Sequence, residues 1–285
     1  MRQVFSIPVL GAVAGLIFSA VACGGNDSAS GGGGNNNPPS GGPPPAGAPT
    51  MKIATSATLG NYLVDGNGRS LYYYAKDFPA AGSNAAVSNC TGAGGCLALW
   101  PVFDASSVVV QGINASDVGE ITRADGSKQT TFRGWPLYYF AGDMNAGDVN
   151  GEGFGSIWFV LHDQAYSVLL MSNPSGQPPT LYLADGAGRT LYYFFQDTVG
   201  TATTPPVSAC TTTCLASWPI FLTNSTVVPS ILTASDFTVF TRPDGQMQSA
   251  YKGHPLYYFA GDAAPGDTKG RGVNNVWDSL DPRVL

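Results

Sequence analysis

An internal repeat constrains this chain more than any other feature. The decapeptide that begins at Gly134 returns at Gly253, an offset of 119 residues, with one residue changed. Two shorter relatives, at 71–77 and 191–197, stand at matching positions upstream. Self-similarity at a fixed period is typical of tandem copies of one folding unit. We therefore expect two pseudo-symmetric repeats of about 115–120 residues.

All four segments share one spacing, Tyr-x4-Asp, which gives the motif pairs Tyr72/Asp77, Tyr138/Asp143, Tyr192/Asp197 and Tyr257/Asp262. Side chains alternate along a strand, so residues five apart point to opposite faces and lie roughly 16 Å apart. The Tyr and Asp of one motif therefore cannot bond each other in a straight strand. We expect each Tyr to meet the Asp of the other motif in its repeat, and each Asp to accept backbone N–H groups at a strand end.

Local sequence patterns predict an all-β fold. Aromatic and aliphatic runs at 62–64 and 70–75 flank a Gly-rich turn, which predicts a hairpin. A second hairpin is predicted where 130–132 and 136–141 flank Arg133-Gly134, and a further strand at 158–161. Helix is expected only as single turns, such as 96–99 before Pro101. The Pro/Gly/Ser stretch at 172–179 sets the domains as 51–171 and 172–285.

The N-terminus predicts export and lipid attachment. An apolar run follows Arg2 and ends in Ser19-Ala20-Val21-Ala22-Cys23, which resembles a bacterial lipobox. We expect a lipoprotein signal peptide at 1–22, lipidation of Cys23 and a Gly/Pro/Asn/Ser-rich disordered tether over 23–50. A free signal peptide or an uncleaved anchor is the alternative. The expected location is the outer membrane or the cell surface or periplasm of a bacterium.

Cysteine usage agrees with export. Besides Cys23 there are four cysteines, two in each repeat: Cys90, Cys96, Cys210 and Cys214. Of the three possible connectivities, the repeats favour local pairing, as Cys90–Cys96 and Cys210–Cys214. Neither spacing is the Cys-x-x-Cys of thiol oxidoreductases, and no basic residue lies nearby in sequence to lower a thiol pKa.

Several function classes lack their signatures. The formal net charge is −6 and there is no basic stripe, so no nucleic-acid partner is expected. No Gly-x-Ser-x-Gly elbow, P-loop, His-Glu-x-x-His or haem-attachment motif is present, so no enzyme and no cofactor is expected. Catalysis by carboxylates alone, acting on envelope glycans, is an alternative because it requires only two carboxyl groups about 5–10 Å apart.

One acidic loop is a weak calcium candidate. It carries Asp143, Asn145, Asp148, Asn150 and Glu152, and calcium takes six to eight oxygen ligands. In the second repeat only two carboxylates survive, and basic side chains join them: Asp262 and Asp267, with Lys269 and Arg271. The alternative is that the carboxylates accept the amides of their own turns. The sequence otherwise predicts no metal site.

Combined motifs carry a family resemblance. Each repeat contains an Asp-Gly-x-Gly-Arg turn, a Leu-Tyr pair, a Cys pair before Trp-Pro, Gly-x-Pro-Leu-Tyr-x-Phe-x-Gly-Asp and a closing Trp, from Met51 to Asp281. In this the chain resembles the secreted-repeat lipoproteins defined by the Tyr-x4-Asp motif. The resemblance implies an exported lipoprotein with no assigned reaction. The second repeat departs from the first at His254 and Lys269, which stand where Trp135 and Asn150 do.

The expected function is a non-catalytic binding or scaffold module, tethered to a membrane, for an envelope protein or glycan. The aromatic strands offer a platform for sugar rings if one face is exposed, and sheet packing if both are buried. A role accessory to extracellular redox or metal handling is a further alternative.

Overall fold

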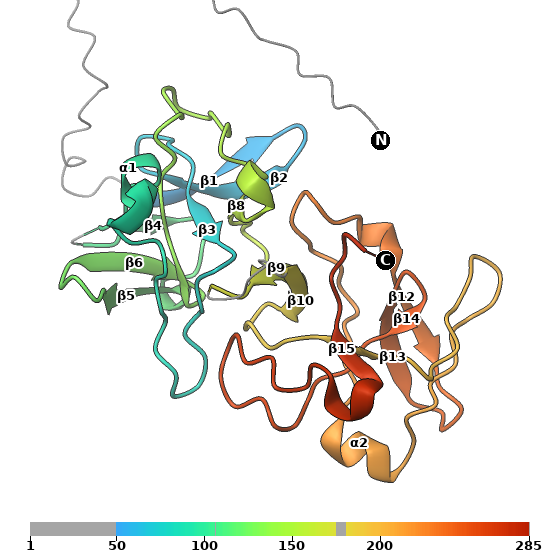
Figure 1. The fold of residues 1–285 in the computed structure, drawn as a ribbon. Coiled ribbons are helices and arrows are strands. Elements are labelled where there is room, and N and C mark those ends of the chain that lie inside the picture. Colours follow the sequence, from blue (N-terminus) through green and yellow to red (C-terminus); the bar gives the residue numbers. More distant parts are fainter. Residues whose placement is uncertain (1–49, 106, 175–180, 285) are drawn as a thin grey trace, which may run out of the picture. The chain divides into compact units, whose positions relative to one another are not determined.

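The computed structural model describes residues 50–105, 107–174 and 181–284 (Figure 1). The expected signal peptide, Cys23 and nearly all of the tether lie outside this part of the chain, so those expectations stay predictions. Within the described ranges, no helix is both long and apolar enough to span a bilayer. Both repeats fall within a single compact unit.

The first repeat is built from short strands, two to six residues long, and one helical turn. Its strands and helix are β1 (Met51–Ser56), β2 (Gly60–Asp65), β3 (Tyr72–Tyr74), α1 (Cys96–Leu99), β4 (Val110–Gln111), β5 (Val118–Thr122), β6 (Lys128–Phe132), β7 (Trp135–Pro136) and β8 (Trp158–Val160). Short 3-10 turns, Ala93–Gly95, Ala115–Asp117 and Phe154–Ser156, connect them.

The second repeat follows the same order, except that its described residues contain no counterpart of β4. Its elements are β9 (Val168–Ser172), β10 (Leu181–Asp185), β11 (Tyr192–Phe194), α2 (Thr213–Ser217), β12 (Phe237–Thr241), β13 (Met247–Tyr251), β14 (His254–Pro255) and β15 (Trp277–Ser279), with 3-10 turns at Ala234–Asp236 and Val273–Asn275. The all-β expectation is confirmed, and helix is limited to single turns.

The first predicted hairpin pairs differently from the expectation. β2 pairs with β1 and β3 pairs with β8, both antiparallel. The two runs that the sequence suggested as partners meet only at the bridge between Val64 and Ser70. The sequence did not predict β1 as the partner of β2. The Gly-rich turn after β2 suggested pairing with the segment that follows it, residues 70–75.

The second predicted hairpin is confirmed. β5, β6 and β7 form a three-stranded antiparallel sheet, and β12, β13 and β14 form its counterpart (Figure 1). The turn after β6 places both Arg133 (φ 48°) and Gly134 (φ 82°) in the left-handed region. A type I′ turn requires this, and its twist matches that of the flanking strands.

Strand pairing places β9 with the second repeat. β9 pairs with β10 along five positions, and the equivalent strands β1 and β2 pair along six. All five side chains of β9 are buried, whereas those of β1 are mostly half-buried. Ser172 at the end of β9 donates its backbone N–H to Ala75 of the first repeat at 2.7 Å. β9 is therefore covered on both faces, which explains its continuous apolar run.

The two repeats share one hydrophobic core. A large buried cluster contains side chains from both, including Leu63 and Leu161 of the first and Leu183 and Leu280 of the second. Two smaller clusters belong to one repeat each and hold its tryptophan stack. The indole N–H of Trp135 also donates to the Gly186 carbonyl at 3.2 Å.

Candidate functional site

The four Tyr-x4-Asp motifs bond one another in crossed pairs. Four hydroxyl-to-carboxylate hydrogen bonds join them, all between motifs: Tyr72 to Asp143 at 2.7 Å, Tyr138 to Asp77 at 2.7 Å, Tyr192 to Asp262 at 2.7 Å and Tyr257 to Asp197 at 2.8 Å. The expectation of pairing between motifs within a repeat is confirmed. Each repeat therefore has two of these Tyr–Asp hydrogen bonds, which join its first half to its second half.

Each carboxylate also holds a backbone amide. The other oxygen of each Asp accepts an N–H from a following loop: Asn89 to Asp77, Asn150 to Asp143, Ala209 to Asp197 and Lys269 to Asp262, at 2.6–3.0 Å. The four tyrosines are completely buried, Asp77 is buried, and Asp143 is 5% exposed. The motif therefore shapes loops from inside the fold and presents no open groove.

Burial sets the proton affinities of these groups. It raises the pKa of Asp77 to about 7 and that of Asp197 to about 6, against the lowering effect of the backbone N–H and Tyr hydroxyl bonds. Burial likewise raises the pKa of Asp143 and of Asp262. The pKa of Tyr72 lies well above its ordinary value, because of burial first and the bond to Asp143 second.

A stack of aromatic rings lies between the two crossed pairs of each repeat. In the first repeat, the indoles of Trp100 and Trp158 are parallel, with centroids 3.8 Å apart. Tyr72 meets Trp100 edge-on at 5.4 Å, and Tyr138 meets Trp158 at 5.1 Å. Tyr74 stacks on the outer face of Trp158 at 4.1 Å.

The second repeat reproduces this stack. Trp218 and Trp277 are parallel at 3.7 Å, flanked by Tyr192 at 5.5 Å and Tyr257 at 5.1 Å. Phe194 takes the place of Tyr74, at 4.2 Å from Trp277. The motif aromatics thus pack on both faces of their strands, so of the two alternatives sheet packing describes these residues.

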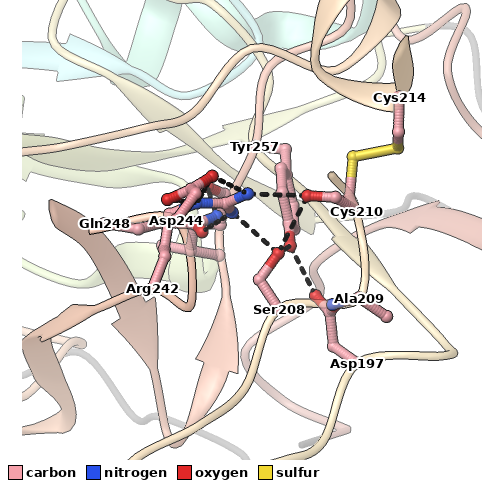
Figure 2. Close-up of a disulfide and its surroundings, with 10 residues drawn as sticks. Asp197, Ser208, Ala209, Cys210, Cys214, Arg242, Asp244, Gln248 and Tyr257 are labelled. Carbon is pink, nitrogen blue, oxygen red and sulfur yellow. Dashed lines mark hydrogen bonds and ion pairs between the residues drawn. A yellow bond between two sulfur atoms is a disulfide. The ribbon is translucent and has the colours of Figure 1, made fainter. Parts of the chain in front are cut away.

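One buried arginine in each repeat, near Asp77 or Asp197, was not identified from the sequence. Arg242 is 2% exposed, and it bonds Ser208, Gln248 and the Cys210 carbonyl at 2.5–2.7 Å (Figure 2). Ser208 in turn bonds the hydroxyl of Tyr257 at 2.6 Å. The network therefore runs from the guanidinium through a serine to the Tyr–Asp pair.

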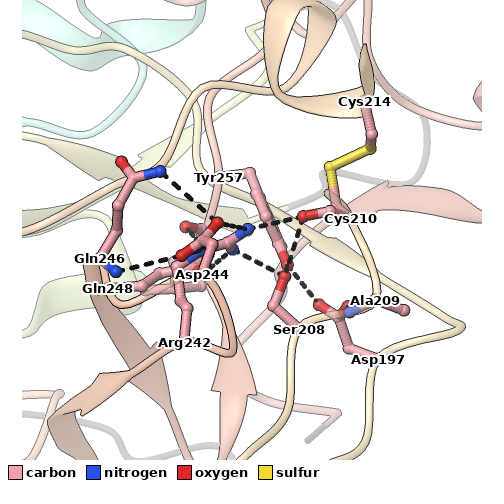
Figure 3. A network of polar contacts seen from close by, with 11 residues as sticks. Asp197, Ser208, Ala209, Cys210, Cys214, Arg242, Asp244, Gln246, Gln248 and Tyr257 are labelled. Carbon is pink, nitrogen blue, oxygen red and sulfur yellow. Dashed lines mark hydrogen bonds and ion pairs between the residues drawn. A yellow bond between two sulfur atoms is a disulfide. The ribbon is translucent and has the colours of Figure 1, made fainter. Parts of the chain in front are cut away.

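The same network exists in the first repeat. Arg123 is 6% exposed and donates to Ser88, Gln129 and the Cys90 carbonyl. Arg242 also forms an ion pair with Asp244 at 3.1 Å, as Arg123 does with Asp125 at 3.7 Å, and Gln246 approaches the Asp244 carboxylate (Figure 3). These arginines lie in Thr-Arg-x-Asp-Gly turns, which look like surface turns in the sequence.

A second set of crossed Tyr–Asp bonds was also missed. Tyr139 donates to Asp65 and Tyr258 to Asp185, each at 2.9 Å. The aspartates belong to the Asp-Gly-x-Gly-Arg turns. In the second repeat Arg189 covers the Tyr258 ring at 4.0 Å and pairs with Asp185. These bonds tie each Gly-rich turn to the other half of its repeat.

Both local disulfides are present, as expected: Cys90–Cys96, with Cα atoms 5.5 Å apart, and Cys210–Cys214, at 5.3 Å. Each lies at the N-terminal side of a helical turn, α1 or α2. Because the carbonyls of Cys90 and Cys210 accept from the buried arginines, each disulfide also fixes one wall of the polar network.

The acidic loop binds its own backbone in place of a cation. Asp148 accepts the amides of Met144 and Asn145 at 2.9 and 2.8 Å, and Glu152 accepts that of Val160 at 2.7 Å. In the described residues no three His, Cys, Asp or Glu side chains gather as metal ligands would. The calcium candidate is therefore not supported, and the turn-amide alternative describes this loop.

An open pocket of about 500 Å³ lies in the second repeat, away from the motif pairs. It lies between a Thr/Pro-rich loop, 200–206, and β12. The only ionisable side chains in its lining are Asp236 and Lys252. No constellation of converging carboxylates lines it, so it offers no geometry of the glycosidase kind.

Comparison with known proteins agrees with this architecture. The family model described as a secreted repeat of unknown function matches residues 54–104, 119–162, 182–221 and 238–280, more than half of the chain. Each matched segment contains one Tyr-x4-Asp motif, so each structural repeat consists of two family units that exchange their Tyr–Asp bonds. Neither the curated proteins nor the solved structures gave a match. The matched segments, the motif and the fold together show that the chain belongs to this family of secreted repeats.

Proposed function

We propose that the chain is a non-catalytic binding module of the bacterial envelope, held by a lipid on Cys23, and that β12 binds an extended segment of a partner protein. One difference between the repeats carries the proposal. At matching positions the first repeat has Glu120 on the edge strand β5 and Lys128 on the neighbouring strand β6, whereas the second has Val239 on β12 and Met247 on β13.

The charged pair protects the first edge. Glu120 and Lys128 form an ion pair at 2.7 Å with both side chains about half exposed. Charged side chains on an edge strand oppose pairing with another chain. Val239 and Met247 leave 41% and 45% of their area exposed, so the second edge lacks this protection and presents apolar surface.

The backbone of β12 offers hydrogen bonds to a new strand. Ser249 donates its backbone N–H to Phe221, on the side away from β12, so Ser249 and Val239 form a non-bonded pair of the ladder. The N–H and C=O of Val239 therefore point outward. Among the described strands none pairs with this edge.

The pocket lies along the same edge. Thr238, Val239 and Phe240 of β12 contribute to its lining. An added strand would hydrogen-bond to β12 and place alternate side chains toward this pocket, which is how sheet edges recognise extended peptides. The motif aspartates are already bonded by Tyr hydroxyls and backbone amides, and the buried arginines by Ser, Gln and Cys carbonyl groups, so these groups leave little catalytic chemistry at the surface. This favours a binder over an enzyme.

Selection from a displayed library of random decapeptides tests the site directly. Selected peptides should shift the amide NMR signals of Val239 and its β12 neighbours. The double variant Val239→Glu/Met247→Lys, which copies the first repeat, should abolish those shifts and weaken binding at least about tenfold, since each added charge loses its hydration in the interface.

The reciprocal variant Glu120→Val/Lys128→Met is the matched control. It should create a second, weaker peptide site on β5 while leaving the first intact. Peptides that map elsewhere, or that bind the edge-charged variant equally well, would contradict the proposal. A chain that dimerises through β12 in light scattering, and becomes monomeric in the edge-charged variant, would replace the partner protein by a second copy.

A further inference from the structure

The aromatic stack and its two Tyr–Asp bonds form one connected unit in each repeat. The order in the first repeat is Tyr72, Trp100, Trp158 and Tyr138, with ring centroids 5.4, 3.8 and 5.1 Å apart. We propose that this unit takes one oxidising equivalent from a one-electron oxidant at the surface and holds it as a neutral tyrosyl radical, with the proton on the bonded aspartate.

The stacked indoles suit the electron step. Two parallel rings at 3.8 Å share a positive hole, which favours its formation on the pair over formation on a single ring. Trp100 and Trp158 are only 2% and 3% exposed, so bulk water has little access to the hole. The rings of Tyr72 and Tyr138 lie in direct contact range, so transfer from either Tyr to the indole pair is a short step.

The crossed aspartates suit the proton step. A tyrosine that loses an electron becomes strongly acidic and must release its hydroxyl proton. In the first repeat Tyr72 gives its electron to the Trp100 cation radical and its proton to Asp143, 2.7 Å away. The products are neutral Trp100, a neutral tyrosyl radical and a protonated Asp143, and charge and electrons balance.

Proton affinities support this direction. Burial raises the pKa of Tyr72, so it does not ionise beforehand, and burial raises the pKa of Asp143, so the carboxylate is a better base than one in water. At Tyr72 the second partner of the hydroxyl is a donor: Gly151 gives its N–H to the Tyr72 oxygen at 3.3 Å. The proton therefore has one acceptor within hydrogen-bond distance.

Packing of the core does not by itself explain why stacked indoles, edge-on tyrosines and hydrogen-bonded aspartates occur together. Aromatic rings in a sheet core pack well as phenylalanine, and the stack's own Phe194 shows that a Tyr position tolerates this. All four tyrosines that contact an indole pair edge-on also donate to a carboxylate. The partly exposed Tyr74, stacked on Trp158, connects the first stack to the surface, whereas Phe194 cannot be oxidised in this way.

Flash photolysis of the exported chain tests the unit, with a ruthenium(III) polypyridyl generated in solution as the one-electron oxidant. Transient absorption and electron paramagnetic resonance distinguish tryptophan from tyrosyl radicals. The tryptophan radical should form first and decay as the tyrosyl radical rises. This second step should be slower in D₂O than in H₂O, because the hydroxyl proton moves with the electron.

Two matched variants locate the radical. The first replaces Tyr72, Tyr138, Tyr192 and Tyr257 by Phe and should lose the tyrosyl signal while the tryptophan radical persists. The control replaces Tyr139 and Tyr258 by Phe. Those residues also donate to aspartates but contact Phe103 and Phe221 in place of an indole pair, so the signal should remain.

A tyrosyl signal that survives in the first variant, or that falls equally in both, would overturn the proposal. So would a wild-type tyrosyl rise at the same rate in D₂O and H₂O, a measurement that does not depend on any variant folding. Circular dichroism of each variant verifies that its fold is retained.

Discussion

At the scale of single residues, the carboxylates of the buried Asp77 and the half-buried Asp197 act as pH-sensitive groups. Each accepts one Tyr hydroxyl and one backbone amide, and each lies near a buried arginine. Burial nevertheless raises the pKa of Asp77 from 3.8 to about 7. The folded chain therefore holds this proton at pH values where the unfolded chain has released it.

This shift predicts that Asp77 stabilises the fold most in acid. Its contribution is complete below the unfolded pKa of 3.8 and is lost as pH rises to about 7, a decline of roughly 4 kcal/mol. Asp77→Asn removes the titration. The free energy of unfolding of the wild type, relative to Asp77→Asn, should therefore fall across this window in urea titrations.

The exposed Asp104 provides the control, because Asp104→Asn removes a surface carboxylate and leaves the buried Asp77 in place. A wild type that gains stability relative to Asp77→Asn as pH rises would show that the carboxylate is held ionised by Arg123 and its hydrogen bonds. The sign of the slope thus decides which effect dominates at this residue.

The crossed Tyr–Asp bonds were predictable from the sequence, and the buried arginines were not. Strand alternation excludes bonding within a motif, and the repeat supplies an equivalent partner one half-repeat away. Arg123 gives no such signal, since a single Arg before an Asp-Gly turn is usually solvated. Its burial depends on Ser88, Gln129 and the Cys90 carbonyl, which come together only after folding.

At the scale of elements, a tight turn fixes the pairing of β13 with β14. The turn between β13 and β14 contains Lys252 (φ 45°) and Gly253 (φ 81°). A Cβ on Gly253 would lie 2.3 Å from the Gly200 carbonyl oxygen. Glycine is therefore needed at position 253 for two reasons: the backbone has positive φ, and the loop 200–206 approaches it closely.

Gly253→Ala should lower stability by more than about 2 kcal/mol, through strain at positive φ together with the clash. Gly245→Ala is the matched control, because Gly245 has φ 81° but open space around it. It should cost only about 1–2 kcal/mol, the strain alone. Equal losses in thermal or urea unfolding would mean that the loop moves aside without cost.

The same elements show where sequence reasoning stops. The Arg133-Gly134 turn and the strand at β8 follow from local residue types and were predicted. The pairing of β3 with β8 joins segments more than eighty residues apart, and nothing local in Tyr72–Tyr74 specifies that partner. The replacement of Glu120 by Val239 can be read from the aligned repeats. That Val239 lines a pocket beside β12 is known only from the structure.

At the scale of the whole described unit, the repeats share a core and bonds that cross between them. Leu63 of the first repeat and Leu183 of the second belong to the same buried cluster, and both are fully buried. β9 is covered by both repeats, and Trp135 donates to Gly186. Neither repeat buries its apolar surface without the other, so the two should unfold in one cooperative step.

Leu63→Ala tests this coupling, because truncating a buried leucine costs about 2–5 kcal/mol. If the core is shared, hydrogen exchange at Tyr192 in the second repeat should speed up as much as at Tyr72 in the first. Leu183→Ala should give the same result in reverse. Exchange that changes only in the mutated repeat would show that the repeats unfold independently. The common cluster would then be a contact between two separately stable bodies, and the edge of β12 would function without the first repeat.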